Sequence, residues 1–326
     1  MFDLLISTAR EDENILAAYL EGSRTVPGVP KDIFQDYDLV YVVKETGPFI
    51  EDRKWIDRFG ERLYMQYPEE GFWDNGNHEN CYGWLMQFAD GNRLDLHVCT
   101  LPYVKEQLKK GEPYQILLDK TECLPVPEQV SDKIYWVKKP SQEEFLAACN
   151  EFWWCLNNVA KGLWREELPY VMDQLDVIIR PMLFKVLSWK AGKDHDFSVS
   201  VGKSGKYLKR YLPKELYERY LRTYPAGEKG AIWKSVLEMC DVFENVAREV
   251  SKTLNFSYDE EEGRNSRAWL ERVYKLPKDA KEICGSHGFA DVDPFFEIGV
   301  FLQLGAAQLN SGVTAAGSRE DCLKPL

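Results

Sequence analysis

The sequence lacks the spacing patterns of the common metal and thiol sites. Its eight cysteines never occur as C-x-x-C, which excludes the usual structural zinc and thioredoxin-like motifs. Only four histidines are present, and none of them forms H-x-x-x-H, so a histidine metal centre is not predicted. We therefore expect reduced and mostly buried thiols.

Long apolar runs and an excess of positive charge are also missing. The longest apolar stretches end well before the roughly 18 residues that a membrane helix needs, so no membrane partner is expected. The formal net charge of -12 argues against nucleic acid as a partner, because binding a phosphate backbone needs clustered Lys and Arg. The first residues, MFDLLISTAREDE, are acidic where a secretory signal is basic, so we expect a cytoplasmic protein.

The chain of 326 residues is longer than one hydrophobic core usually grows, and its pattern changes near Pro140. Before Pro140, alternating apolar residues predict strands at 38–43 and 93–98. A helix is predicted at 9–21, ending at Gly22. This part therefore mixes strands and helices.

The part after Pro140 carries long helical patterns. Ser141 and Glu144 form a capping box at the start of one helix, and a second is predicted at 166–190 with a kink at Pro181. Shorter patterns predict further helices at 204–212, 214–223, 229–254 and 266–275. We expect a mixed domain at 1–140, a helical substrate-binding domain at 141–283 and a tail at 284–326 without an assigned role.

Three acidic residues are the main candidates for chemistry. Asp36 and Asp38 lie two apart at the start of a strand, and Asp95 alternates with leucines on a second strand. Carboxylates that meet at one sheet edge need cations, and hard oxygen ligands suit magnesium. Two magnesium ions held in this way are the usual arrangement for phosphoryl and nucleotidyl transfer.

Gly22 and Ser23 fit the same chemistry. A glycine at a turn lets backbone N–H groups approach phosphate oxygens, and a serine adds a hydroxyl donor. The combination of Gly-Ser, a D-x-D pair and a later Asp in an alternating strand is more specific than any of its parts. It predicts a site for a nucleotide with its metal ions.

Longer stretches of the sequence resemble a known family. YLEGSRT, VPKDIFQDYDLVYVV, GNRLDLHV, VKKP, CNEFW, VAKGLWREEL and LSWKAG are similar to the aminoglycoside 6-adenylyltransferases, the bacterial streptomycin-resistance enzymes. The resemblance covers roughly residues 1 to 283. It implies an α+β protein, with a polymerase-beta-like nucleotidyltransferase palm followed by an all-helical bundle.

The resemblance also implies an activity. AMP would pass from ATP to a hydroxyl of an aminoglycoside, at the 6-position of streptomycin, with release of pyrophosphate and loss of antibiotic action. Gly22 and Ser23 would hold the triphosphate, Asp36 and Asp38 would bind two Mg²⁺ ions, and Asp95 would bind the catalytic one. The acidic charge balance suits a cationic aminoglycoside as partner.

The helical part offers further candidates. Asp173 is the candidate general base or substrate ligand, because an acid of the second domain can face the cleft. Asp176 is a candidate substrate contact, although its spacing from Arg180 also fits an ordinary helix ion pair. Lys203 and Lys206 are candidates for the ATP phosphates, or form a solvated basic turn.

Simpler interpretations remain open for the acidic residues. Asp36 and Asp38 also fit solvated acids at a loop-to-strand turn, and Asp95 also fits an exposed acid paired with Arg93. A protein that binds a nucleotide without transferring it is one alternative function. Nucleotidyl transfer to another acceptor is a second alternative.

Overall fold

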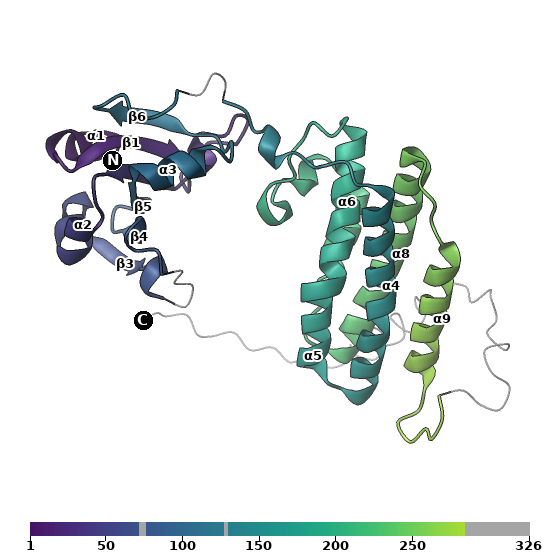
Figure 1. The fold of residues 1–326 in the computed structure, drawn as a ribbon. Coiled ribbons are helices and arrows are strands. Elements are labelled where there is room, and N and C mark those ends of the chain that lie inside the picture. Colours follow the sequence, from purple (N-terminus) through teal and green to yellow (C-terminus); the bar gives the residue numbers. More distant parts are fainter. Residues whose placement is uncertain (72–75, 127–129, 284–326) are drawn as a thin grey trace, which may run out of the picture.

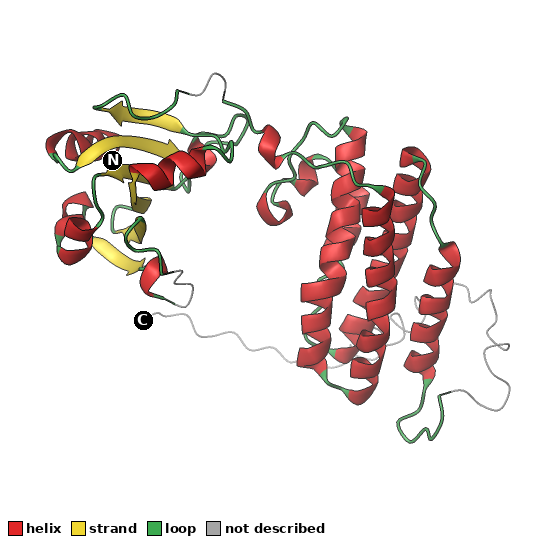
Figure 2. Cartoon of the chain, viewed as in Figure 1, coloured by secondary structure: helices red, strands yellow, loops and turns green. Residues whose placement is uncertain are grey.

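The computed structural model describes residues 1–71, 76–126 and 130–283; the predicted tail at 284–326 lies outside the described residues. A six-stranded sheet with helices is followed by a bundle of helices, which confirms the predicted α+β class. The two parts lie side by side in Figure 1, and Figure 2 shows that the strands belong to the first part alone.

The sheet has the strand order β3-β4-β5-β2-β1-β6, in which β2 and β5 are parallel and the other neighbours are antiparallel. Its strands are β1 (Ile15–Glu21), β2 (Tyr37–Val43), β3 (Arg62–Gln66), β4 (Cys81–Phe88), β5 (Arg93–Thr100) and β6 (Gln115–Asp119). Its helices are α1 (Phe2–Glu11), α2 (Gly47–Glu51) and α3 (Leu101–Leu108). Short 3₁₀ turns lie at η1 (Gly22–Arg24), η2 (Trp55–Phe59) and η3 (Pro68–Glu70).

Strands β2 and β5 contain the predicted strands at 38–43 and 93–98 and lie in the middle of the sheet. The run from Leu39 to Val43 is buried throughout, as expected for a strand that is covered on both faces. In β5 the buried Leu94, Leu96 and Val98 alternate with less buried residues. These two strands carry the predicted acids.

The predicted helix at 9–21 is wrong. Helix α1 ends at Glu11, and Ile15–Glu21 forms β1 between β2 and β6. Leu5, Thr8 and Ala9 give α1 its buried face. The apolar run that begins at Ile15 suits either type of element, and pairing with two neighbouring strands selects the strand.

The helical part begins with η4 (Lys133–Tyr135) in the linker. Its helices are α4 (Gln142–Arg165), α5 (Leu168–Asp173), the π-helix η5 (Gln174–Ile179), α6 (Arg180–Asp194), α7 (Lys214–Leu221), α8 (Lys229–Leu254) and α9 (Glu260–Lys275), with 3₁₀ turns at η6 (Lys203–Gly205) and η7 (Leu208–Arg210). The predicted capping box is confirmed, because Ser141 and Glu144 each accept a hydrogen bond from the other's backbone N–H. The predicted helices at 214–223 and 229–254 correspond to α7 and α8.

The helix predicted at 166–190 is interrupted near the proline. The segment Gln174–Ile179 is π-helical and ends just before Pro181. Proline lacks the N–H that continues an α-helical ladder, so a changed hydrogen-bond pattern before it is expected. Pro181, at which the sequence predicted a kink, therefore explains the interruption.

Two other helix predictions need correction. Residues 204–212 form only the turns η6 and η7, because Gly202, Ser204 and Gly205 all have positive φ. Helix α9 begins at Glu260, six residues before the predicted start, since Asp259 caps it by accepting from the backbone N–H groups of Glu261 and Glu262. An acidic side chain in this position supplied the missed signal.

The buried side chains form separate cores. The helical core runs from Phe145 to Val273, whereas the two faces of the sheet pack against clusters that end at Leu124. The predicted division at residue 140 falls between these cores. None of the helices in the described ranges is long and apolar enough to cross a membrane.

Helix packing in the second core predicts unequal effects along α4. Phe152 is fully buried and stacks on Phe243 of α8, with ring centroids 3.7 Å apart, whereas Trp154 is 69% exposed. Phe152→Ala should lower the free energy of unfolding by about 3–5 kcal/mol. Trp154→Ala should change it by about 0.5 kcal/mol or less. Urea unfolding followed by circular dichroism measures both, and equal losses would contradict this assignment of the core.

Candidate active site

Strand register brings the predicted acids together at one edge of the sheet, which is formed here by the ends of the inner strands β2 and β5. Asp38 of β2 lies directly opposite Asp95 of the parallel strand β5, and Asp36 immediately precedes β2. Directly paired residues on neighbouring strands point to the same face, so Asp38 and Asp95 are neighbours there. The juxtaposition that the sequence predicted for these two acids is present.

Glu21 extends this row and was missed in the sequence. It is the last residue of β1, and antiparallel pairing places it opposite Asp38. Glu21, Asp38 and Asp95 therefore occupy equivalent positions on three adjacent strands. The stretch YLEGSRT contained the signal, but it was recognisable only if the residues before Gly22 were read as a strand.

Burial and mutual repulsion affect the protonation of these acids. Burial, followed by the charges of Asp95 and Asp36, raises the pKa of Asp38 to about 6. Burial, followed by the charges of Asp38 and Glu112, raises the pKa of Glu21 to about 7. The pKa of Asp36 is also raised, mainly by burial, while Arg93 opposes the shift. Because these carboxylates repel one another when they are ionised, a cation beside them would be stabilising.

Arg93 is the cation that pairs directly with these acids. Its guanidinium donates two hydrogen bonds to Asp95, of 2.8 and 2.7 Å, and lies 3.6 Å from the Asp36 carboxylate. The pairing of Asp95 with Arg93, one of the interpretations open from the sequence, is therefore observed. Bidentate pairs of this kind are the stronger type of charge-assisted hydrogen bond.

Arg24 holds the segment that leads into β2. It donates hydrogen bonds to the backbone carbonyls of Asp36 and Gln35, at 2.8 and 2.7 Å. Its guanidinium also lies over the ring of Tyr37, 3.9 Å from the ring centre. The backbone beside Asp36 is thus tied to the turn that follows β1.

That turn begins with Gly22, where only glycine fits. Gly22 has φ of +68°, and a Cβ built on it would lie 2.1 Å from Oδ2 of Asp38. The sequence placed this glycine at the end of a helix, whereas it follows a strand. Its role is to let the turn backbone approach the acidic row closely.

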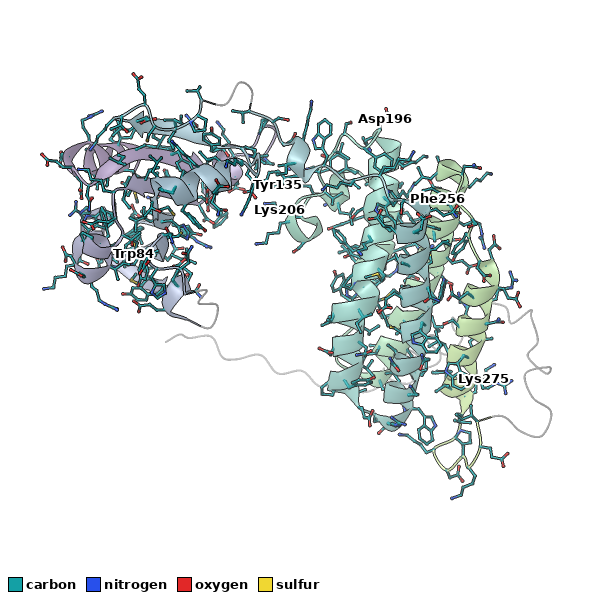
Figure 3. All side chains as sticks on the ribbon, in the orientation of Figure 1. Trp84, Tyr135, Asp196, Lys206, Phe256 and Lys275 are labelled. Atoms are coloured by element: carbon teal, nitrogen blue, oxygen red, sulfur yellow. The ribbon has the colours of Figure 1, made fainter. Side chains whose placement is uncertain are left out.

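A cavity of about 520 Å³ contains all four residues that were predicted to bind the nucleotide. Gly22 and Ser23 line it from the sheet part, and Lys203 and Lys206 line it from the helical part. Figure 3 shows Lys206 near Tyr135 of the linker, which also lines the cavity. The remaining lining residues are apolar, aromatic or small: Val26, Val29, Ser200, Val201, Gly202 and Tyr207.

The two lysines are exposed, as the alternative of a solvated basic turn also requires. Lys203 belongs to turn η6, and Lys206 directly follows it with its ammonium 5.1 Å from the ring centre of Tyr207. Exposed ammonium groups at the wall of a cavity are suited to bind phosphate. Their exposure fits a solvated basic turn, and the role in phosphate binding stays a prediction.

The two predicted acids of the helical part lie elsewhere. Asp173 is the exposed last residue of α5, the helix that lies at the end of the bundle away from the linker in Figure 1. Within the described part of the chain, no hydrogen bond or ion pair joins Asp173 to the acids of the sheet edge. Asp176 accepts two hydrogen bonds from Arg180, at 3.1 and 3.0 Å, so the predicted helix ion pair is observed.

The donor set at the sheet edge can be compared with what magnesium requires. Asp36, Asp38 and Asp95 offer carboxylate oxygens, the hard ligands that Mg²⁺ prefers. Across residues 1–71, 76–126 and 130–283, no three His, Cys, Asp or Glu side chains are already arranged as a metal-binding group. The ligand chemistry fits the ion, provided that Arg93 releases Asp95.

Comparison with known proteins finds relatives that share one named activity. A family model described as streptomycin adenylyltransferase matches residues 1–273. The chain is 34% identical to the aminoglycoside 6-adenylyltransferase of Bacillus subtilis (strain 168), over 81% of this chain and 93% of the relative. It is 35% identical to the enzyme of the same name from Campylobacter jejuni, over 79% and 89% of the two chains.

A solved structure is similar as well. The crystal structure of an aminoglycoside 6-adenyltransferase from Bacillus subtilis matches 85% of this chain and 98% of its own, with 31% identity and a TM-score of 0.43. The family model and the two relatives each cover most of the chain. The protein therefore belongs to the streptomycin adenylyltransferase family of nucleotidyltransferases.

Proposed function

We propose that this protein transfers AMP from ATP to a hydroxyl of an aminoglycoside, at the 6-position of streptomycin, and so inactivates the antibiotic. The carrying observation is the register that sets Asp38 opposite Asp95, beside a cavity lined by Gly22, Ser23, Lys203 and Lys206. The named activity of the relatives supports the same chemistry.

The cavity suits a nucleotide in two ways. Lys203 and Lys206 provide ammonium groups for the phosphates, and the turn at Gly22 offers a close approach to the backbone. Tyr135 and Tyr207 provide aromatic surface for the base. ATP held here would direct its phosphates toward the acidic row next to Gly22.

The acids then have separate roles. Asp36, Asp38 and Asp95 would hold two Mg²⁺ ions, which when bound neutralise the charge that develops on the phosphate oxygens and the leaving pyrophosphate. Arg93 would release Asp95 as this site fills. The attacking hydroxyl forms the bond to the α-phosphorus, the bond to pyrophosphate breaks, and a carboxylate accepts the hydroxyl proton. Asp173 would do this only when the helical part brings the far end of its bundle to the acids of the sheet edge.

The acceptor is a polycation, and the chain has a net charge of -12. An acidic protein attracts a cationic drug over distances of about one Debye length, roughly 8 Å in physiological salt. Asp176, although paired with Arg180, keeps an exposed carboxylate that can contact a guanidinium or ammonium group of the drug.

Asp38→Asn should reduce transfer by about 10²-fold or more, because it removes a ligand of the Mg²⁺ ions that would neutralise the charge of the reacting phosphates. Pyrophosphate release from MgATP is measured with and without streptomycin. Asp3→Asn, an exposed acid on α1, is the matched control and should keep full activity. Release that needs neither Asp38 nor the drug would contradict the proposal, and ATP binding without release would favour a binding protein.

Gly22→Ala and Gly28→Ala separate the effect of backbone strain from that of close approach. Both glycines have positive φ, but a Cβ at Gly28 meets nothing within 4 Å, whereas one at Gly22 collides with Asp38. Each variant should lose about 1 kcal/mol of stability from the backbone alone. Only Gly22→Ala should also lose ATP binding, measured by isothermal titration. Equal ATP affinity in the two variants would contradict the role of Gly22.

The proposal that Asp173 is this base, although α5 lies at the far end of the bundle, predicts that Asp173→Asn lowers kcat by about 10²-fold while ATP affinity stays close to normal, because a general base acts only on the attacking hydroxyl. Asp279→Asn, an exposed acid in the turn after α9, is the control. A kcat that falls in Asp173→Asn and stays normal in Asp279→Asn would support the assignment. Unchanged kcat would overturn it, and the base would have to be sought at the sheet edge.

A further inference from the structure

Two cysteine side chains meet on the same face of the sheet as the acidic row. Cys81 opens β4, and antiparallel pairing places it directly opposite Cys99 of β5. The Cys99 thiol donates a hydrogen bond to the Cys81 sulfur, with 3.0 Å between the two sulfur atoms. Among the cysteines in the described residues, this is the one pair with a contact between sulfur atoms.

The backbone of the two strands already has the spacing for a disulfide. The neighbouring pair, Asn80 and Thr100, is joined by a hydrogen bond from the Thr100 N–H to the Asn80 carbonyl, of 2.9 Å. Because the two kinds of pair alternate along an antiparallel ladder, Cys81 and Cys99 form a non-hydrogen-bonded pair, with Cα atoms about 4.5 Å apart. Disulfides span Cα separations of about 4.4–6.8 Å, so side-chain rotation alone can join these sulfurs.

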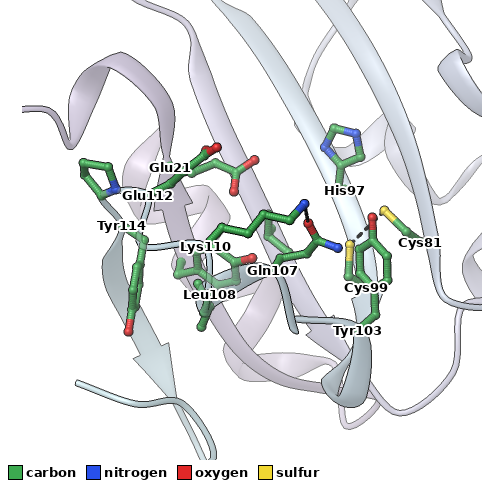
Figure 4. Close-up of a pocket in the computed structure, with 13 residues that line it drawn as sticks. Glu21, Cys81, His97, Cys99, Tyr103, Gln107, Leu108, Lys110, Glu112 and Tyr114 are labelled. Carbon is green, nitrogen blue, oxygen red and sulfur yellow. Dashed lines mark hydrogen bonds between the residues drawn. The ribbon is translucent and has the colours of Figure 1, made fainter. Parts of the chain in front are cut away.

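A small oxidant can reach this pair. Both thiols line a cavity of about 200 Å³ together with His97, Tyr103 and Gln107, and Figure 4 shows the sulfur atoms beside the Tyr103 hydroxyl. One water molecule needs roughly 10–15 Å³, so a molecule the size of hydrogen peroxide fits. Cys81 is only partly buried, whereas Cys99 is 3% exposed.

The surroundings give the two sulfurs different roles. The hydrogen bond to Cys81, followed by burial, holds the pKa of the Cys99 thiol well above its usual value. Cys81 is the more accessible sulfur and accepts that hydrogen bond. Cys81 is therefore the sulfur that an oxidant meets first, and Cys99 is the one positioned to complete a disulfide.

We propose that Cys81 and Cys99 form a modification site that hydroperoxides convert reversibly into a disulfide. The Cys81 sulfur takes one oxygen from the peroxide, the O–O bond breaks, and one water leaves for each hydrogen peroxide consumed. The Cys99 sulfur then bonds to the Cys81 sulfur, the S–O bond breaks, and the second water carries away the Cys99 proton. Two thiols are oxidised by two electrons, and one peroxide is reduced to two waters.

The test uses the full reduced chain. The protein is treated with hydrogen peroxide in slight excess, free thiols are blocked with N-ethylmaleimide, and peptides from a non-reducing digest are mapped by mass spectrometry. We expect a cross-linked peptide that joins Cys81 to Cys99 and disappears after dithiothreitol. Unlinked Cys81, or Cys81 joined to another cysteine, would overturn the proposal.

Two variants make the test specific. Cys99→Ser removes the second sulfur, so the peroxide-treated variant should carry a sulfenic acid on Cys81 that dimedone traps. Cys123→Ser alters a cysteine of the segment after β6, whose thiol donates to Asp119, and should leave the Cys81–Cys99 cross-link unchanged. Circular dichroism checks that the Cys99→Ser protein is folded. If Cys81 of the folded variant does not react with dimedone, the proposed order of the two steps is contradicted.

Discussion

The register of strands β1, β2 and β5 is the constraint on which the site depends. Because side chains alternate along a strand, this register sets Glu21, Asp38 and Asp95 on one face in adjacent positions. Burial beside like charges raises the pKa of Asp38 to about 6. The row is tolerable only with cations nearby, and Arg93 meets this need in the described structure.

The same close packing explains the shape of the turn after β1. A side chain at position 22 would collide with Asp38, so only glycine allows the chain to turn there. This turn also places Ser23 at the wall of the large cavity and Arg24 against the backbone that precedes β2. One local requirement thus connects the acids with the proposed nucleotide pocket.

The helical part borders the proposed nucleotide pocket through a loop and not through its long helices. The backbone N–H of Val137 donates to the carbonyl of Val199 at 2.9 Å, which ties the linker to the segment that carries Lys203 and Lys206. Positive φ at Gly202 and Gly205 bends this segment into turns, so that it borders the cavity. Phe184 of α6 lies close behind the loop, because a Cβ built on Gly205 would come within 2.6 Å of its ring.

The sequence, through its local patterns and its family resemblance, was enough to predict the class of the fold. The strands that carry Asp38 and Asp95 were recognisable from alternating apolar residues, and the capping box at Ser141 and Glu144 located the first long helix, because both patterns depend on near neighbours in the chain. Only tertiary structure decided that Ile15–Glu21 is a strand, that Glu21 joins the acids, and that Cys81 faces Cys99. Those features depend on which strands pair and in which register, and residues distant in sequence set both.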